Sequence, residues 1–284
     1  MTSQPTPATG STPEGAGEGR TAVIGVGVMG EALVSGLVRA GRPTASLLLG
    51  EKRPERAAEL TERYDVAVVD NVAAARGATT VVLVVKPQDM DEVVAEIAHV
   101  IRPGQLVVSL AAGITTAFLE ARLADGVAVV RVMPNTPALV DQGMLTISPG
   151  SHCTEAHLAE VEGLLATTGR VMRLPEKHQD AATAISGSGP GYVFFVVESM
   201  IEAGVHLGLP RATATELVVQ TLVGSAAMLR ETGDHPVVLR EQVTSPAGTT
   251  AAALRELEVH GVRAAFLAAL EAAHDRSRAL AGGS

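Results

Sequence analysis

Gly25-Val-Gly-Val-Met-Gly30 is the stretch that decides the fold of this 284-residue chain. It follows a short apolar segment, Thr21-Ala-Val-Ile-Gly25, which predicts a β-strand. It precedes residues 31–40, where apolar side chains recur at helical spacing and end at Gly41. A G-x-G-x-x-G pattern between a strand and a helix is typical of a dinucleotide-binding turn, because the glycines let the backbone approach a pyrophosphate at the start of the helix.

The turn therefore predicts a set of contacts with a dinucleotide. The pattern alone is weak, so a glycine-rich turn without a ligand is the alternative interpretation. The cofactor-binding residues expected here are Gly25, Gly27, Val28, Met29 and Gly30.

Strand and helix patterns alternate beyond the turn. The continuous apolar run at 80–85 suits a strand that is buried on both faces of a parallel sheet. The alternation at short spacing predicts an α/β fold with an N-terminal Rossmann-like, doubly wound sheet. The expected strands are 21–25, 46–50, 66–69, 80–85, 106–110, 127–131 and 145–147, and the expected helices are 31–40, 54–63, 71–76 and 89–100.

The strand signals end near residue 174, and the rest predicts an all-α C-terminal domain. Its expected helices are 190–206, 211–231, 246–259 and 262–280. Several of them are apolar on more than one face, as Phe194, Phe195 and Met200 show for the first. Such helices bury their surface poorly alone, so we expect an interleaved homodimer through this domain.

The domain boundaries follow from composition. Residues 1–19 carry almost no large apolar side chain and predict a disordered tail, because they cannot offset the entropy cost of ordering. We expect a dinucleotide-binding domain at 20–176 and a helical substrate-binding and dimerisation domain at 177–284.

Composition also argues against several classes of function. The formal net charge is −9 and no basic cluster is long enough for a nucleic-acid arm, so no nucleic-acid partner is expected. No segment reaches the roughly 20 apolar residues that span a bilayer, and no secretory signal is present, which favours a cytoplasmic protein without a membrane partner. Cys153 is the only cysteine, and no residues have metal-ligand spacing, so no metal is expected.

Glu51-Lys-Arg53, just past the second expected strand, bears on the choice of cofactor. A carboxylate at this place receives the adenosine ribose hydroxyls of NAD, whereas Lys or Arg holds the 2′-phosphate of NADP. Two cations, Lys52 and Arg53, follow a single acid, so we expect NADPH, with NADH as the alternative. The other interpretation of the two cations is a solvated loop.

Further candidate residues lie near the ends of the expected strands. Lys86 and Pro87 follow the strand at 80–85, and ligands bind at the carboxyl ends of strands in such sheets. Asn135 is expected either to reach the nicotinamide amide or to serve only as a turn residue. Asn71 is expected to cap the short helix that runs through Arg76.

Ser245-Pro-Ala-Gly-Thr-Thr250 is expected to open the third C-terminal helix. Ser245 suits an N-cap, Pro246 suits the first turn, and the exposed amides of a helix start favour an anion. Thr249 and Thr250 add hydroxyls close to these amides. An N-cap without a ligand is the alternative.

Six segments in this order resemble the pyrroline-5-carboxylate reductase family over residues 21–281. They are Gly25-Val-Gly-Val-Met-Gly30, Val85-Lys-Pro87, Ser109-Leu-Ala-Ala-Gly113, Arg131-Val-Met-Pro-Asn-Thr-Pro137, Ser186-Gly-Ser-Gly-Pro190 and Ser245-Pro-Ala-Gly-Thr-Thr250. The resemblance implies reduction of 1-pyrroline-5-carboxylate to L-proline by NAD(P)H, the last step of proline biosynthesis. It also implies a homodimer, or a higher homo-oligomer such as a decamer.

The resemblance implies roles for the last segment. Thr250 would be the catalytic residue, whose hydroxyl hydrogen-bonds the ring nitrogen of the substrate. The substrate carboxylate would be held by Ser245 and by the amides of Gly248, Thr249 and Thr250. A second subunit is expected to complete this pocket.

Two further matches and one departure accompany the resemblance. Asn71 and Lys86 match positions that contact the cofactor in the family. Ala247 stands where the family usually has a second glycine. We expect its methyl group to be tolerated if the backbone there is helical.

Two other functions compete with this one. A related imine or β-hydroxyacid reductase shares the architecture, but a hydroxyacid enzyme would carry a catalytic lysine on the helix between the domains, and no lysine follows Lys177. A non-catalytic NADP-binding regulatory protein would keep the glycine turn without needing the segment from Ser245 to Thr250.

Overall fold

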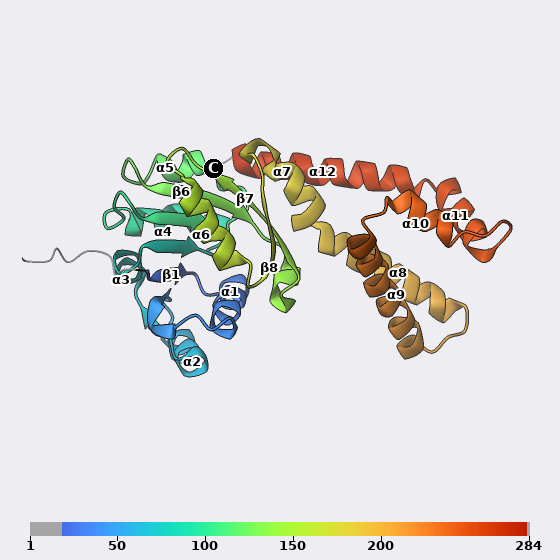
Figure 1. Ribbon diagram of the computed structural model, residues 1–284, viewed down its shortest axis with the longest axis horizontal. Helices are drawn as coiled ribbons and strands as arrows, with labels where there is room; N and C mark the ends of the chain where they lie inside the picture. The colour runs from blue at the N-terminus through green and yellow to red at the C-terminus, as the bar shows by residue number, and fades with distance from the viewer. Residues whose placement is uncertain (1–18, 283–284) are drawn as a thin grey trace, which may run out of the picture. The chain divides into compact units, whose positions relative to one another are not determined.

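The computed structural model describes residues 19–282 of the chain (Figure 1). The chain divides between Glu176 and Lys177 into two compact units. The tail expected at residues 1–19 lies outside the described residues except for Gly19.

The first unit is built on an eight-stranded sheet with the order β3-β2-β1-β4-β5-β6-β7-β8. The first six strands are parallel, β7 is antiparallel to β6, and β8 is parallel to β7. The strands are β1 (Thr21–Ile24), β2 (Leu47–Gly50), β3 (Ala67–Val69), β4 (Thr80–Leu83), β5 (Leu106–Ser109), β6 (Ala128–Met133), β7 (Gly143–Pro149) and β8 (Gly169–Arg173). The order 3-2-1-4-5-6 is that of doubly wound dinucleotide-binding sheets, so the predicted α/β fold is confirmed.

Two hydrophobic cores cover the two faces of this sheet. Alternate residues of a strand face opposite cores: in β1, Val23 packs into one core and Ala22 and Ile24 into the other. The core of Val23 is completed by α1 (Val28–Arg39), α2 (Pro54–Tyr64) and α6 (Glu155–Leu165). The opposite core is completed by α3 (Asn71–Arg76), α4 (Met90–Ile97) and α5 (Thr116–Glu120). Short 3₁₀ turns lie at η1 (Thr44–Ser46), η2 (Pro87–Asp89), η3 (Thr136–Val140) and η4 (Glu176–His178).

The sequence predicts seven of the eight strands and misses β8. Its residues, Gly169-Arg-Val-Met-Arg173, include two arginines and are mostly exposed, because β8 is one of the two edge strands of the sheet. Helices α5 and α6 also lack a prediction. The periodicity signal is weak in these three elements, so tertiary contacts and caps define them instead.

The second unit, coloured gold to red in Figure 1, is entirely helical among the described residues. Its elements are α7 (Gln179–Ala182), a π-helical turn η5 (Thr183–Gly187), α8 (Gly189–His206), α9 (Arg211–Thr232), α10 (Pro236–Gln242), α11 (Thr249–Val259) and α12 (Val262–Gly282). Helix α8 packs against α9, and α12 packs against α7 and η5. The hydroxyl of Ser277 in α12 donates to Asp180 in α7 at 2.7 Å.

Large apolar side chains of α8 and α9 remain exposed in the single chain. Phe195 is 69% exposed and Leu217 is 54% exposed. Among the described residues, α9 is the one helix long and apolar enough to cross a membrane by length and composition, whereas no such segment is expected from the sequence. Helices that bury apolar surface against other protein segments also meet these criteria of length and composition. The exposed apolar residues of α8 and α9 fit burial against a further protein surface.

The packing of α1 on the sheet yields a stability prediction. A Cβ on Gly30 would lie 2.7 Å from the carbonyl oxygen of Gly25, so Gly30→Ala must push the helix away. We expect the free energy of unfolding to fall by about 1–3 kcal/mol, as for other overpacked sites. Urea unfolding followed by circular dichroism measures the change.

Gly163→Ala is the matched control for this change. Gly163 is an exposed residue of α6, and a Cβ there would meet nothing within 4 Å in the described chain. The control should raise stability by up to about 1 kcal/mol, because Ala favours the helix. Equal effects of the two substitutions would contradict the packing argument.

Candidate functional site

The three glycines of the turn after β1 have three different structural roles. Gly25 has a φ of +87°, and a Cβ there would lie 2.7 Å from Cγ1 of Val85. Gly30 lets the first turn of α1 rest on the Gly25 carbonyl. A Cβ on Gly27, by contrast, would meet nothing within 4 Å in the part of the chain that the structure describes. A tight turn, an open face and a close helix contact fit the requirements of a pyrophosphate site.

The open face of the turn is also the N-terminus of α1. Gly27 is the N-cap, and no side chain of the described residues caps the helix. The amides of Val28, Met29 and Gly30 are therefore the first-turn donors that an anion can use. The turn follows β1, which lies next to β4, where the strand order reverses and ligands bind in such sheets.

The chain after β4 runs beside this turn. The Val84 amide donates to the Ile24 carbonyl at 2.8 Å, and Val85 lies against Gly25. Lys86 and Pro87 come next and are exposed, and Pro87 opens η2. The structure thus brings the segment of Lys86 to the same end of the sheet as the glycine turn.

Ion pairs organise the loop between β2 and α2. Arg53 binds Glu51 through Nε and Nη2, at 3.0 and 3.1 Å, and its backbone amide donates to the same carboxylate. These hydrogen bonds lower the pKa of Glu51 although burial acts in the opposite direction. Lys52 pairs with Glu96 at 3.0 Å, and this contact raises the pKa of Lys52. Arg53 stays 67% exposed, so its outer face is accessible.

The capping role expected for Asn71 is wrong. Asp70 caps α3 by accepting from the Ala73 amide at 2.7 Å, and Asn71 is the first helical residue. The Asn71 side chain is buried and donates to Glu96 at 3.0 Å, so it joins Lys52 around one carboxylate. Asp70 lies one residue earlier, and its carboxylate can accept from the third amide of the helix, so Asp70 and not Asn71 is the cap.

Asn135 follows β6 and precedes η3. Its side-chain oxygen accepts a hydrogen bond from the Met144 amide at 2.9 Å, which ties the loop to β7. This contact agrees with a structural role for Asn135 in the loop, and the contact with a nicotinamide amide stays a prediction.

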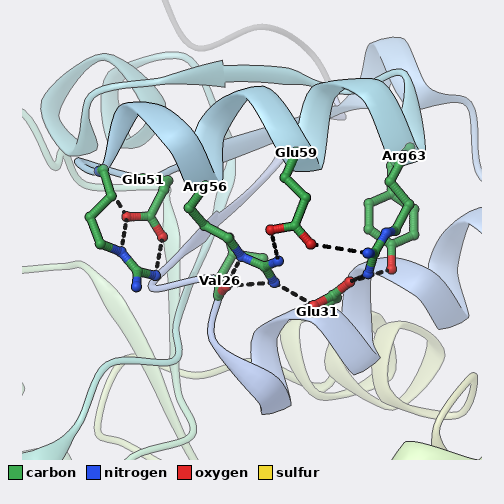
Figure 2. Close-up of polar contacts among 8 residues, drawn as sticks. Val26, Glu31, Glu51, Arg56, Glu59 and Arg63 are labelled. Carbon is green, nitrogen blue, oxygen red and sulfur yellow. Dashed lines mark hydrogen bonds and ion pairs between the residues drawn. The ribbon is translucent and has the colours of Figure 1, made fainter.

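A network of charged side chains joins α1 to α2 (Figure 2). Arg56 contacts Glu31 and pairs with Glu59 at 2.7 Å. Arg63 contacts Glu31 as well and pairs with Glu59 at 3.0 Å. The Tyr64 hydroxyl donates to Glu31 at 2.9 Å. One carboxylate in the first turn of α1 therefore receives three donors from α2.

The hydrogen bonds of this network favour the ionised form of Glu31. Burial alone would raise the pKa of Glu31, but hydrogen bonds from Arg56, Tyr64 and Arg63 outweigh it and keep that pKa below its usual value. Arg56 also donates from Nε and Nη2 to the carbonyl of Val26, at 3.4 Å each. Figure 2 shows this second contact, which reaches into the glycine turn.

The segment around Ser245 does not open the helix as expected. Helix α11 begins at Thr249, with Gly248 as its N-cap, so Ser245 is not the cap and Pro246 is not in the first turn. The Gly248 amide donates to the Ser245 carbonyl at 3.0 Å, which closes a four-residue turn. Ala247 has a φ of +56°, the value that the third residue of a type II turn requires.

This turn leaves the start of α11 open. No side chain in the described structure caps the helix, so the first-turn amides, including those of Thr249 and Thr250, are available donors. A Cβ on Gly248 would meet the Ser245 hydroxyl and would lie 3.1 Å from the Ser245 carbonyl oxygen, so a side chain there requires Ser245 to shift. Thr250 is half-buried, whereas Ser245 and Thr249 are exposed.

The two units match two family models. Residues 176–280 match the model for pyrroline-5-carboxylate reductase dimerisation, and residues 20–113 match NADP oxidoreductase, coenzyme F420-dependent. The chain is 48% identical over 263 residues to a pyrroline-5-carboxylate reductase of Corynebacterium melassecola, covering 91% of this chain and 97% of the relative. The chain belongs to the pyrroline-5-carboxylate reductase family.

Solved structures of the reductase family agree over most of the chain. The enzyme of Coxiella burnetii has a TM-score of 0.88 at 34% identity and covers 93% of this chain and 99% of its own. The enzyme of Plasmodium falciparum, solved with NADP bound, has a TM-score of 0.83 at 30% identity and covers 94% of this chain and 100% of its own. The dimerisation match supports self-association through the C-terminal helices.

Sequence reasoning misses three side chains around the glycine turn of this reductase-family chain. Glu31, Arg56 and Tyr64 come from two helices, and the contact between Glu31 and Arg56 joins residues 25 positions apart. Helical spacing signals only the pairs within α2, such as Arg56 with Glu59. Metal ligation is not indicated: among residues 19–282 no group of three or more His, Cys, Asp or Glu is arranged to hold an ion.

The left-handed residue of the turn before α11 yields a second prediction. Ala247 occupies a conformation that costs an L-residue about 1–2 kcal/mol. Glycine removes this cost but adds about 0.5–1 kcal/mol of chain entropy. We expect Ala247→Gly to raise the free energy of unfolding by about 1 kcal/mol or less, measured by urea unfolding at fixed protein concentration.

Ala251→Gly, in the first turn of α11, is the control for that measurement. Its backbone is helical, so the same exchange should lower stability by about 1 kcal/mol. A similar loss in Ala247→Gly would show that the turn is not strained.

Proposed function

We propose that this chain reduces 1-pyrroline-5-carboxylate to L-proline with NADPH, as the last step of proline biosynthesis. The observation that carries the proposal is the uncapped start of α11, next to Thr250, in a chain that also has the open glycine turn. The names of its relatives support the same reaction.

The cofactor site proposed here lies at the carboxyl ends of β1, β2 and β4. Gly25, Gly27, Val28, Met29 and Gly30 would hold the pyrophosphate through the turn and the first amides of α1. Lys52, Arg53 and Asn71 would serve the adenosine end, and Lys86 and Pro87 would border the site after β4. Asn135 would shape the loop after β6.

Arg53 favours NADPH over NADH. Both oxygens of Glu51 are bound by Arg53, and the Glu51 side chain is only 8% exposed, so this carboxylate is poorly placed to accept two ribose hydroxyls. The exposed guanidinium can meet a 2′-phosphate instead. The bound NADP in the Plasmodium falciparum relative supports this choice.

The substrate site proposed here is the turn and first residues of α11. The amides of Gly248, Thr249 and Thr250, with the hydroxyl of Ser245, would hold the carboxylate at the positive end of the helix dipole. The hydroxyl of Thr250 would hydrogen-bond the ring nitrogen, which makes it the proposed catalytic residue.

The proposed reaction asks little acid–base chemistry of these residues. Bound NADPH supplies the hydride, and a protonated cyclic imine is already electrophilic. The residues around α11 therefore act by holding the carboxylate and orienting the ring nitrogen, since correct positioning lowers the barrier. Such a site suits hydroxyls and backbone amides better than a strong acid or base.

The assembly and location complete the proposal. The exposed apolar residues of α8 and α9 fit a homodimer through the C-terminal helices, or a higher homo-oligomer such as a decamer. A cytoplasmic location fits a biosynthetic reductase. A related imine reductase is the competing function, and oxidation of NADPH in the presence of pyrroline-5-carboxylate separates the two.

Thr250→Ala tests the proposed catalytic residue. Losing the hydroxyl should lower kcat/KM for pyrroline-5-carboxylate by about a hundredfold, at the lower end of the range for lost transition-state hydrogen bonds. The Kd for NADPH, measured by calorimetry, should not change. Thr250→Ser keeps the hydroxyl and should retain most of the activity, whereas an unchanged kcat/KM in Thr250→Ala would exclude the role.

Arg53→Gln tests the preference for NADPH. Losing the charge that faces the 2′-phosphate should raise the KM for NADPH by about tenfold, equivalent to about 1.4 kcal/mol. The KM for NADH should change little, because NADH lacks this phosphate. An equal rise for both cofactors would place Arg53 in the loop structure alone.

A further inference from the structure

The peptide between Val26 and Gly27 lies at the centre of the glycine turn and is held at both ends. The Val26 carbonyl accepts from Nε and Nη2 of Arg56, at 3.4 Å each, and the Gly27 amide donates to the Gly25 carbonyl at 2.9 Å. The peptide unit is planar, so the direction of the carbonyl also fixes the direction of the amide. Arg56 thereby helps to set the angle at which the chain enters α1.

Helix α2, which carries Arg56, has little apolar attachment to the rest of the unit. All eleven residues of α2 are described, and Leu60 is the one that is buried. The helix begins directly after Arg53, at Pro54. The position of the loop with Lys52 and Arg53 thus depends on the charged contacts of α2 as well as on Leu60 and the partly buried Tyr64.

The charge of Glu31 makes these contacts important for an anionic ligand. Glu31 directly follows Gly30 in the first turn of α1, where its carboxylate suits the helix dipole. The same negative charge would repel a pyrophosphate at this helix start. Arg56 and Arg63 both contact Glu31, so the repulsion is compensated inside the protein.

We propose that Arg56 is a positioning residue for the dinucleotide, which orients the Val26–Gly27 peptide and neutralises Glu31. It acts through these two groups and not by touching the cofactor. The inference rests on the proposed function only in taking the glycine turn as the NADPH site.

The shape of the guanidinium explains why this position needs arginine. Arg56 contacts Glu31, Glu59 and the Val26 carbonyl at once, and its side chain is 18% exposed. A planar fork with several donors can serve three acceptors in different directions, whereas lysine offers one compact ammonium group. Lysine would keep the charge but not all three contacts.

Arg56→Met is the variant that tests the proposal, with Kd values for NADPH and NADH measured by calorimetry on the full chain. We expect both to rise by about tenfold, equivalent to about 1.4 kcal/mol, because the glycine turn serves both cofactors. The KM for NADPH should rise in parallel while kcat at saturating NADPH stays near the wild-type value. Arg56→Lys should raise log Kd by at least half as much as Arg56→Met does.

Arg63→Met is the matched control, because Arg63 shares Glu31 and Glu59 but, in the described structure, its hydrogen bonds go to side chains. It should change Kd by less than about twofold. Equal effects of Arg63→Met and Arg56→Met, or wild-type Kd values in Arg56→Met or Arg56→Lys, would overturn the proposal.

The same measurements separate this inference from the proposed function. Wild-type chain that binds NADPH but does not reduce pyrroline-5-carboxylate would refute the reaction and leave the test of Arg56 valid. Wild-type chain that binds neither cofactor would overturn both. A rise confined to NADPH would contradict action through the shared turn.

Discussion

The contact between Gly30 and the Gly25 carbonyl is the constraint on which the rest of the first unit depends. A side chain at Gly30 would meet that oxygen at 2.7 Å, so α1 can start directly above the end of β1 only because none is present. This close start aims the first amides of α1 at the place where the strand order reverses. It also puts Glu31 within reach of α2, which makes the charge network possible.

The charge network compensates for what α2 lacks in apolar contact. The one fully buried side chain of α2, Leu60, contributes only about 1.5–3 kcal/mol, and Tyr64 packs against the same core only in part. Isolated surface ion pairs contribute little, but Glu31 and Arg56 are about four-fifths buried and share partners within one network. The helix that carries the adenosine-side loop is thereby tied to the helix that starts at the pyrophosphate turn. The two ends of the proposed cofactor site are thus coupled through protein contacts.

The sequence predicts the parts of the structure that rest on local patterns. Short apolar runs separated by helical segments place β1 to β7, because a sheet buried on both faces needs such runs. The sequence does not predict β8, because this edge strand contains Arg170 and Arg173 and has no such apolar run. The sequence predicts Asn71 as the N-cap of α3, but Asp70 is the cap. Asn and Asp are both common N-caps, so spacing alone does not show which of the two neighbours caps the helix. The contact of Arg56 with Glu31 is invisible in the sequence, because only the packing of α1 and α2 brings these residues together.

The turn before α11 is a second place where local sequence patterns do not determine the structure, and here the difference affects the proposed substrate site. Ser and Pro suit a helix start and a type II turn equally well, and the positive φ of Ala247 decides for the turn. A strained residue persists only where its surroundings fix it, and here the Gly248–Ser245 hydrogen bond does so. The amides of α11 are therefore held in place before any ligand binds. A reaction that needs position more than proton transfer is served best by donors that are rigid and uncharged, which is what this turn presents.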